Sequence, residues 1–163
     1  MPWAMVNAAP AFELYIEATD GGITRVLFER PAALAGAPDG GHPLIREAAH
    51  QLAHYFARTR RVFELPLDLR GTAFQVEVWK ALLRIPYGET RSYGQLALDL
   101  GHPGAARAFG AANRANPVSI IVPCHRVVAA GGSLGGYGGG LDRKKFLLDL
   151  ESGASTSLIN ASA

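Results

Sequence analysis

Apolar and polar residues alternate in two stretches among the first thirty positions, which is the pattern of half-buried β-strands. The apolar positions within residues 12–17 and 23–29 recur at period two: Leu14, Ile16, Val26 and Phe28. Residues 19–22, Thr-Asp-Gly-Gly, lie between these stretches and have the composition of a hairpin turn. We therefore expect two antiparallel strands joined by a tight turn.

A helical period replaces the alternation from residue 44 onward. Residues 44–58 place an apolar stripe on one face of a helix: Leu44, Ala48, Leu52 and Tyr55. Residues 62–69 return to a strand-like pattern, although Pro66 restricts such a strand to a sheet edge or a chain exit. Charge and periodicity both change near Arg70. We therefore expect a small α/β domain over residues 1–70 and a second, mostly helical domain over residues 71–163.

The second half of the chain carries signals for helix starts and ends. Thr72 is placed to cap a helix with an apolar face: Phe74, Val78, Trp79, Leu82 and Leu83. Ser92 and Gln95 form the capping box of the next helix, which Gly101 ends. Residues 103–114 form a third helix that opens with proline. Two short helices joined by a glycine-containing turn have the outline of a helix-turn-helix, although many helical hairpins share it.

The single cysteine lies in residues 119–128, Ser-Ile-Ile-Val-Pro-Cys-His-Arg-Val-Val. The β-branched run 120–122 predicts a short buried strand that ends before a proline. This strand would deliver Cys124 next to the basic pair His125 and Arg126, a setting that lowers the pKa of a thiol and favours the nucleophilic thiolate. The alternative is a buried, inert cysteine at a strand end, and the local pattern favours neither interpretation.

Composition narrows the class of protein. The 163 residues are 48% hydrophobic and 18% charged, the balance of a soluble globular protein. A single cysteine excludes an internal disulfide framework, and a free thiol suits a reducing compartment. The first ten residues lack the pattern of a secretory signal, and no apolar run approaches the roughly 20 residues that span a bilayer. A cytoplasmic protein with no membrane partner is expected.

Charge is divided unevenly along the chain. Residues 1–69 hold six Arg and eight Asp or Glu, whereas residues 70–146 hold ten Lys or Arg and four acids. A basic second half attracts polyanions such as nucleic acid, although ordinary solubilising charge explains the same balance. Arg107 and Arg114 favour a nucleic-acid surface, since they lie seven apart among small residues that permit close approach of another backbone: Gly104, Ala105, Ala106, Ala108, Gly110, Ala111 and Ala112.

Seven glycines fall within residues 131–140, interrupted only by Ser133, Leu134 and Tyr137. Such a loop beside a nucleophile can form one wall of a pocket for a flat ligand. A phosphate-binding loop is disfavoured because no Gly-Lys-Ser/Thr ending follows. Asp142 then caps a last helix that ends near Glu151.

A pair of histidines is the candidate for a metal site. His50 and His54 lie four apart on the predicted helix 44–58, a spacing that can bind zinc. No third ligand is in view, so the sequence predicts no metal.

Several motifs recur in the order typical of one family. Pro-Cys-His-Arg-Val-Val at residues 123–128 follows Asn116-Pro117 and precedes Gly-Tyr-Gly-Gly-Gly at residues 136–140. Further matches come earlier: Phe74-Gln75, Val78-Trp79, Ile-Pro-Tyr-Gly-Glu-Thr at 85–90, Ser92-Tyr93 and Ala106-Arg107-Ala108. With these motifs the chain resembles the O6-alkylguanine-DNA alkyltransferases, or methylated-DNA–protein-cysteine methyltransferases, closely over residues 70–151 and in outline before them. The resemblance favours a catalytic Cys124.

The resemblance implies a fold and a mode of DNA binding. The fold would join an N-terminal mixed α/β domain of the ribonuclease H-like kind to a C-terminal winged-helix or helix-turn-helix-like domain. The partner would be double-stranded DNA containing O6-alkylguanine, bound through its minor groove with the target base turned out of the stack. Arg107 matches the arginine that takes the place of the extruded nucleotide. The other expected DNA contacts are Tyr93, Ala106, Ala108, Arg114 and Arg126.

The resemblance also implies the chemistry. Cys124 would accept the alkyl group, activated through a water by His125, which Glu151 orients. Tyr93 matches the tyrosine that donates to the leaving guanine, and Asn116 matches the asparagine that shapes the active-site turn. The thioether product has no good leaving group, so one turnover per molecule and no cofactor are expected. The base pocket would be lined by Val127, Tyr137, Gly138 and Gly139.

Three other functions stay open. A DNA-binding regulator would use the same helices with Cys124 inert. A non-catalytic lesion sensor of the alkyltransferase-like kind has tryptophan in place of the cysteine, so Cys124 argues against it. A cysteine hydrolase would need an oxyanion hole, for which no motif is present.

Lesion preference is also open, because the width of the pocket depends on how residues 131–140 fold. Gly138 stands where some relatives carry serine, which would remove a hydroxyl contact to the alkylated oxygen. Cooperative contacts between molecules on DNA are possible, and the sequence does not decide them.

Overall fold

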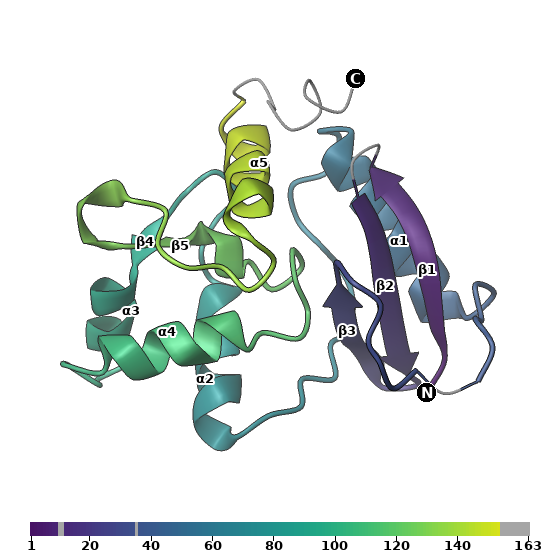
Figure 1. Ribbon diagram of the computed structural model, residues 1–163, viewed down its shortest axis with the longest axis horizontal. Coiled ribbons are helices and arrows are strands. Elements are labelled where there is room, and N and C mark those ends of the chain that lie inside the picture. Colours follow the sequence, from purple (N-terminus) through teal and green to yellow (C-terminus); the bar gives the residue numbers. More distant parts are fainter. Residues whose placement is uncertain (10–11, 35, 154–163) are drawn as a thin grey trace. The chain divides into compact units, whose positions relative to one another are not determined.

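Residues 1–9, 12–34 and 36–153 are described by a computed structural model in which the chain divides into two units. Among these residues, the first unit comprises residues 1–70 together with residues 117–119, and the second comprises residues 71–116 and 120–153. Helices and small sheets are mixed along the chain, so the fold class is α/β (Figure 1). No helix in the described ranges is long and apolar enough to cross a membrane.

The first unit is built on an antiparallel sheet with the strand order β1 (Trp3–Ala9), β2 (Phe12–Thr19) and β3 (Gly22–Leu27). Leu14, Ile16 and Ala18 on the central strand β2 are fully buried, as the period-two pattern predicts. Helix α1 (Pro43–Phe56) lies against the sheet (Figure 1). The predicted hairpin and helix are therefore confirmed.

Two segments of the first unit differ from expectation. Strand β1 was not predicted, because apolar and polar residues do not alternate regularly along residues 3–9, Trp-Ala-Met-Val-Asn-Ala-Ala. Residues 62–69 form no strand, and within them Leu67 alone makes a bridge, to Ile23. Pro66 has no N–H to donate to a ladder, and its carbonyl oxygen instead accepts from the N–H of Ile23 at 2.9 Å.

The second unit is mostly helical. Its helices are α2 (Ala73–Leu82), α3 (Tyr93–Asp99), α4 (Ala106–Arg114) and α5 (Leu141–Ser152). A short parallel pair joins β4 (Arg91–Ser92) to β5 (Val127–Val128). The 3₁₀ turns η1 (Cys124–Arg126) and η2 (Ala130–Gly132) lie before and after β5 in the chain.

The predicted starts of α2 and α3 are confirmed by their caps. The Thr72 hydroxyl accepts from the N–H of Gln75, and the Gln75 side chain accepts from the N–H of Thr72 in return. Ser92 accepts from the N–H of Gln95 at 3.1 Å. Gly101 follows α3 with a φ of 76°, the left-handed conformation that ends many helices.

Two predicted helix starts and one predicted strand in the second unit are wrong. Helix α4 begins at Ala106 rather than at residue 103, because Gly104 adopts a φ of 83°. Helix α5 begins at Leu141, so Asp142 lies inside the first turn rather than at the cap. Residues 120–122 form a turn rather than a strand, with Ile120 at a φ of 71°. This φ is strained for a β-branched residue and persists only where neighbouring contacts hold it.

Candidate active site

Cys124 begins the η1 turn and is buried, with 4% of its surface exposed. Two asparagines brace this turn. Asn116 Nδ2 donates to the Val122 carbonyl oxygen at 2.9 Å, and Asn113 Nδ2 donates to the Cys124 carbonyl oxygen at 3.2 Å. Asn116 is one of the predicted site residues, whereas Asn113 was missed. The signal for Asn113 is its position three residues before Asn116 near the end of α4, on the side of the helix that is buried.

Burial raises the pKa of the Cys124 thiol. Hydrogen bonds from the side chains of Asn116 and Tyr137 and the charge of Lys144 oppose this effect without reversing it. The expected lowering of the thiol pKa by its basic neighbours is therefore wrong. The cause is that both basic neighbours, His125 and Arg126, are bonded to another residue, Glu151.

A fully buried charged cluster follows the cysteine. His125 Nε2 lies 2.7 Å from Glu151 Oε2, and neither side chain is more than 1% exposed. Arg126 Nε and Nη2 donate to the two carboxylate oxygens of Glu151 at 2.8 and 3.0 Å. Although burial alone would raise it, hydrogen bonds from His125 and Arg126 hold the pKa of Glu151 far below its ordinary value.

Burial lowers the pKa of His125, which keeps the imidazole neutral. A carboxylate only accepts hydrogen bonds, so Nε2 carries the ring proton that faces Glu151. Nδ1 is then a lone-pair acceptor, and it is buried without a hydrogen-bond partner in the described part of the chain. This atom has the properties of a general base next to Cys124 in sequence.

Arg126 cannot make the predicted DNA contact, so that assignment is wrong. Arg126 is only 6% exposed. Besides its two hydrogen bonds to Glu151, it donates from Nη1 to the Ile85 carbonyl oxygen at 2.6 Å. The ring of Tyr87 lies 5.7 Å from its guanidinium carbon. Because Arg126 is paired with Glu151 and His125 is neutral, the basic pair offers the thiol no free positive charge.

Lys144 on α5 supplies the positive charge that the basic pair does not. It is fully buried, and its Nζ donates to the carbonyl oxygens of Val127 and Gly136. Burial lowers the pKa of Lys144 to about 8, so the ammonium form still predominates at neutral pH. Lys144 was missed, since Lys144 and Lys145 together look like ordinary surface charge. Its place three residues before the buried Leu147 is the available signal.

The glycine-rich loop, residues 131–140, lies near Tyr93 and the cysteine turn. Tyr93 donates from its hydroxyl to the Gly136 carbonyl oxygen at 3.2 Å, and the Tyr137 side chain lies close enough to the Cys124 thiol to lower its pKa. Burial raises the pKa of Tyr93, against the opposing effects of Arg114 and of the Asn113 amide. The structure thus brings Tyr93 and Tyr137 together with Cys124.

The remaining predicted pocket residues surround the same loop. Val127 is fully buried, and the Gly139 carbonyl oxygen accepts from Arg143 Nη1 at 3.0 Å. A Cβ at Gly138 would lie 3.0 Å from the Arg114 carbonyl oxygen, a separation that leaves little room for a side chain.

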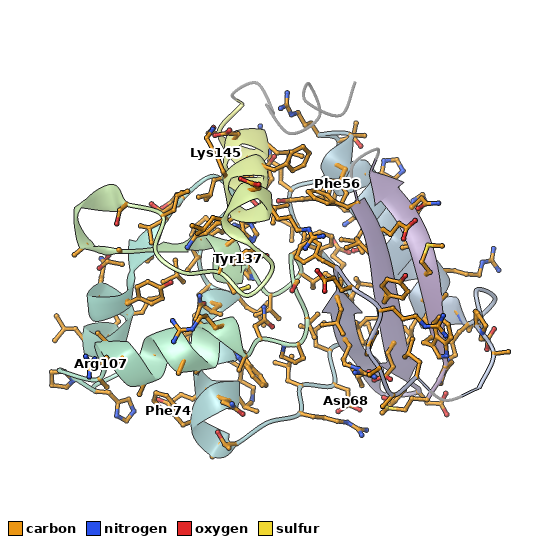
Figure 2. All side chains as sticks on the ribbon, viewed as in Figure 1. Phe56, Asp68, Phe74, Arg107, Tyr137 and Lys145 are labelled. Atoms are coloured by element: carbon orange, nitrogen blue, oxygen red, sulfur yellow. The ribbon has the colours of Figure 1, made fainter. Side chains whose placement is uncertain are left out.

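Of the predicted DNA-binding residues of α4, Arg107 lies apart from this buried group. Figure 2 shows Arg107 at the outer end of α4, whereas Tyr137 lies in the loop before α5. Arg107 and Ala108 are exposed and Ala106 is half-buried. Arg114, also exposed, packs its side chain near Gly136. The exposed face therefore carries two arginines among small residues.

The two histidines of α1 do not gather further ligands. Their rings lie 4.5 Å apart, and His54 Nδ1 is hydrogen-bonded to the Thr59 hydroxyl at 2.8 Å. Within the described ranges, no three His, Cys, Asp or Glu side chains come together as they would to hold a metal ion.

Comparison with known sequences places this site in a family. The model of the family described as "6-O-methylguanine DNA methyltransferase, DNA binding domain" matches residues 73–153. A methylated-DNA–protein-cysteine methyltransferase of Mycobacterium tuberculosis is 58% identical over 121 residues, covering 74% of this chain and 72% of that protein. One from Methanosarcina acetivorans is 45% identical over 146 residues, covering 88% and 94%. The chain belongs to the methylated-DNA–protein-cysteine methyltransferase family.

Solved structures extend the likeness over the whole length. A crystal structure of Mycobacterium tuberculosis OGT in complex with DNA is 44% identical with a TM-score of 0.90, covering 100% of both chains. The O6-methylguanine-DNA methyltransferase of Pyrococcus kodakaraensis is 26% identical with a TM-score of 0.54, covering 92% of this chain and 98% of that one. The chain therefore shares its fold with methyltransferases of this family from a bacterium and an archaeon.

Proposed function

We propose that this chain repairs O6-alkylguanine in double-stranded DNA by transferring the alkyl group to its own Cys124. Relatives of this chain are named methylated-DNA–protein-cysteine methyltransferases, and one relative has been crystallised in complex with DNA. One observation carries the assignment of Cys124 as the acceptor of the alkyl group. The buried His125 is hydrogen-bonded to the buried Glu151 through Nε2, and its Nδ1 is left available as a base.

The chemistry follows from these groups. His125 Nδ1 takes the thiol proton through one water, while Glu151 holds the ring and stabilises its charged form. The thiolate attacks the alkyl carbon in line; a sulfur–carbon bond forms, the carbon–O6 bond breaks, and its electron pair stays on guanine. Tyr93 donates a proton to the leaving guanine. Lys144 places a positive charge near the thiolate, which offsets part of the effect of burial on the thiol pKa.

A single turnover follows from the product. The alkyl group ends in a thioether on Cys124, and a thioether has no good leaving group. Cys124 is also the only cysteine of the chain, so no second thiol is available to accept the alkyl group. Each molecule is expected to repair one base.

DNA binding is assigned to α3 and α4 as a helix-turn-helix that enters the minor groove. The alkylated oxygen lies inside a stacked duplex, so the base must be turned out to reach a buried thiol. Arg107 would fill the place of the extruded nucleotide, and Arg114 with Ala106 and Ala108 would contact the groove and its phosphates. In fold terms, residues 1–70 would form a ribonuclease H-like domain and residues 71–163 a winged-helix-like domain, of which residues 154–163 lie outside the described ranges.

A DNA-binding protein without chemistry is the second candidate, because the raised pKa of Cys124 favours an unreactive thiol. Intact mass after incubation with O6-methylguanine duplex separates the two. Transfer predicts a gain of one methylene on the wild type and none on Cys124→Ser. Tight binding of the duplex with no gain of mass would support the second candidate. Recovery of free Cys124 after reaction would contradict the single turnover.

A further inference from the structure

A cavity at the end of α1 takes no part in the proposed chemistry. It has a volume of about 410 Å³ and is lined by residues of α1 and of the segment that follows it: His50, His54, Thr59, Arg60, Arg61, Val62 and Glu64. The two arginines outnumber the single carboxylate, so the lining is positive even when both imidazoles are neutral. A cavity with this charge fits an anion.

Positive charge is concentrated here although the first unit has an excess of acids. Residues 1–69 hold six arginines, and three of them fall within residues 58–61. The dipole of a helix favours cations in its last turn, which accounts for His54. Arg60 and Arg61 come after Phe56, the last residue of α1, by four and five positions, and the effect of the dipole falls off within the last turn. The dipole therefore does not explain the two arginines.

The turn after α1 sets the tautomer of His54. The N–H and the hydroxyl of Thr59 both donate to the His54 carbonyl oxygen, at 2.9 and 3.1 Å. The hydroxyl has one proton, so in its 2.8 Å contact with His54 Nδ1 the hydroxyl accepts and the ring donates. Nδ1 thus keeps a proton, and Nε2 is the atom that gains or loses one. When Nε2 is protonated, His54 is a charged donor in the lining of the cavity.

Arg60 supplies a second set of donors. Its Nη1 donates to the Val62 carbonyl oxygen at 2.7 Å, which holds the side chain in place. Arg60 makes no other hydrogen bond with the residues that the structure describes, so the other donors of its guanidinium are left for a ligand. The planar fork of a guanidinium matches two oxygens of one phosphate group.

We propose that this cavity binds a phosphate group, with Arg60 donating to its oxygens and the protonated imidazoles of His50 and His54 adding positive charge. The centroids of the two rings are 4.5 Å apart, which is close enough for one anion to lie against both. A metal ion would suit the same two histidines, but Arg60 and Arg61 would repel a cation, and within the described ranges no third ligand joins the pair. The phosphate belongs either to a DNA backbone or to a free anion. Neither source needs Cys124 or an alkylated base, so this site is independent of the proposed function.

Inorganic phosphate is the first probe. The ring-proton resonances of the five histidines are followed by NMR at about pH 6.5 while phosphate is added, with sodium chloride at equal ionic strength as the control. The resonances of His50 and His54 are expected to move with phosphate far more than with chloride, because the site is built for an oxyanion. The resonances of His42 and His125 serve as internal references. The midpoint of the titration gives the dissociation constant.

Three variants test the assigned residues. Arg60→Gln is expected to weaken phosphate binding by about tenfold, because it removes the charged fork. Arg70→Gln is the matched control, since it removes the same charge from an exposed arginine of the first unit that pairs with Asp68 outside the cavity, and it should change the affinity less than about twofold. Glu64→Gln is expected to tighten binding by about threefold or more, because it removes the one negative charge of the lining.

An unmodified DNA duplex distinguishes the two sources of phosphate. Binding is measured as a function of salt concentration for the wild type, Arg60→Gln and Arg70→Gln. If the cavity holds a phosphate of the backbone, Arg60→Gln lowers the slope of log K against log salt by about 0.9, the loss of one phosphate contact, and the control keeps the slope of the wild type. If the slopes agree while inorganic phosphate still moves the resonances of His50 and His54, the ligand is a free phosphate.

Any one of three results would overturn the phosphate site. Phosphate could move the resonances of His50 and His54 no more than chloride does, Arg60→Gln could bind phosphate as tightly as the wild type, or Glu64→Gln could bind it more weakly. None of these results bears on the transfer of the alkyl group to Cys124, which the gain of one methylene tests separately.

Discussion

The turn around Cys124 and the outer face of α4 belong to the same unit but differ in how their charges are arranged. In the turn, Glu151 is bonded by His125 and Arg126, and all three side chains are almost fully buried. On α4, Arg107 is exposed to solvent. The buried charges depend on one another for stability, whereas the exposed arginine can be changed without cost to the fold.

Reactivity and stability are therefore coupled in the turn around Cys124, whereas binding and stability are separate on the outer face of α4. A change in the buried cluster of His125, Arg126 and Glu151 alters the protonation of His125 and also leaves a buried charge without its partner. A change on the exposed face of α4 is expected to alter DNA binding, which we propose for that face. The three predictions below test this contrast, in order of decreasing effect on the free energy of unfolding.

Glu151→Gln is expected to have the largest effect. Removing the carboxylate leaves Arg126 charged and buried, which should lower the free energy of unfolding by about 3–5 kcal/mol at pH 7. The pKa of Glu151 is depressed in the folded state, so its contribution is present above the ordinary pKa of 4.5 and is lost as the pH falls. Urea unfolding between pH 7 and pH 4 should therefore show a smaller pH dependence in Glu151→Gln than in the wild type.

Glu89→Gln is the matched control, because Glu89 pairs with Arg91 at 3.1 Å in an exposed position of the same unit. It should cost less than about 1 kcal/mol. Similar losses in the two variants would remove the distinction between the buried and the exposed charges.

Lys144→Met is expected to have an intermediate effect that depends on pH. The folded protein releases the Lys144 proton near pH 8, whereas the unfolded chain keeps it to about the ordinary value of 10.5. Since the unfolded state then binds more protons, this residue makes the free energy of unfolding rise with pH by up to about 1.4 kcal/mol per unit between these values. The difference in unfolding free energy between wild type and Lys144→Met measures that slope.

Lys145→Met serves as the control, since the neighbouring lysine is exposed and pairs with Asp149 at 2.8 Å. Its substitution should change the free energy of unfolding by less than about 1 kcal/mol. A difference for Lys144→Met that does not change between pH 8 and 10.5 would contradict the lowered pKa of the buried lysine.

Arg107→Ala is expected to change the free energy of unfolding least, by less than about 0.5 kcal/mol, because the side chain is exposed. Its effect should appear in DNA repair. Loss of the residue that we propose fills the place of the extruded nucleotide should slow transfer from O6-methylguanine duplex by about tenfold or more, and leave the reaction with free O6-benzylguanine unchanged. Equal losses on the two substrates would remove the role assigned to Arg107.

Features that depend on neighbours in the chain could be read from the sequence. The β2–β3 hairpin follows from period-two alternation around a glycine turn, and the starts of α2 and α3 follow from the caps Thr72 and Ser92. The motif around Cys124 likewise indicated the family without any structure. These signals are local because alternation, capping and motif spacing are set by residues a few positions apart.

Features that depend on distant partners were decided by the tertiary structure. Arg126 looked like a DNA contact and is instead held by Glu151, 25 residues away, and Lys144 looked like surface charge and is buried against Val127 and Gly136. Asn113 gained its significance only when its amide nitrogen met the Cys124 carbonyl oxygen. The sequence by itself determined the family and those local elements that rest on alternation and capping, and it predicted Cys124 as the reactive residue. Only the tertiary structure decided which charges are neutralised and which acceptor is left unpaired, because burial and long-range pairing set the energy of a polar group.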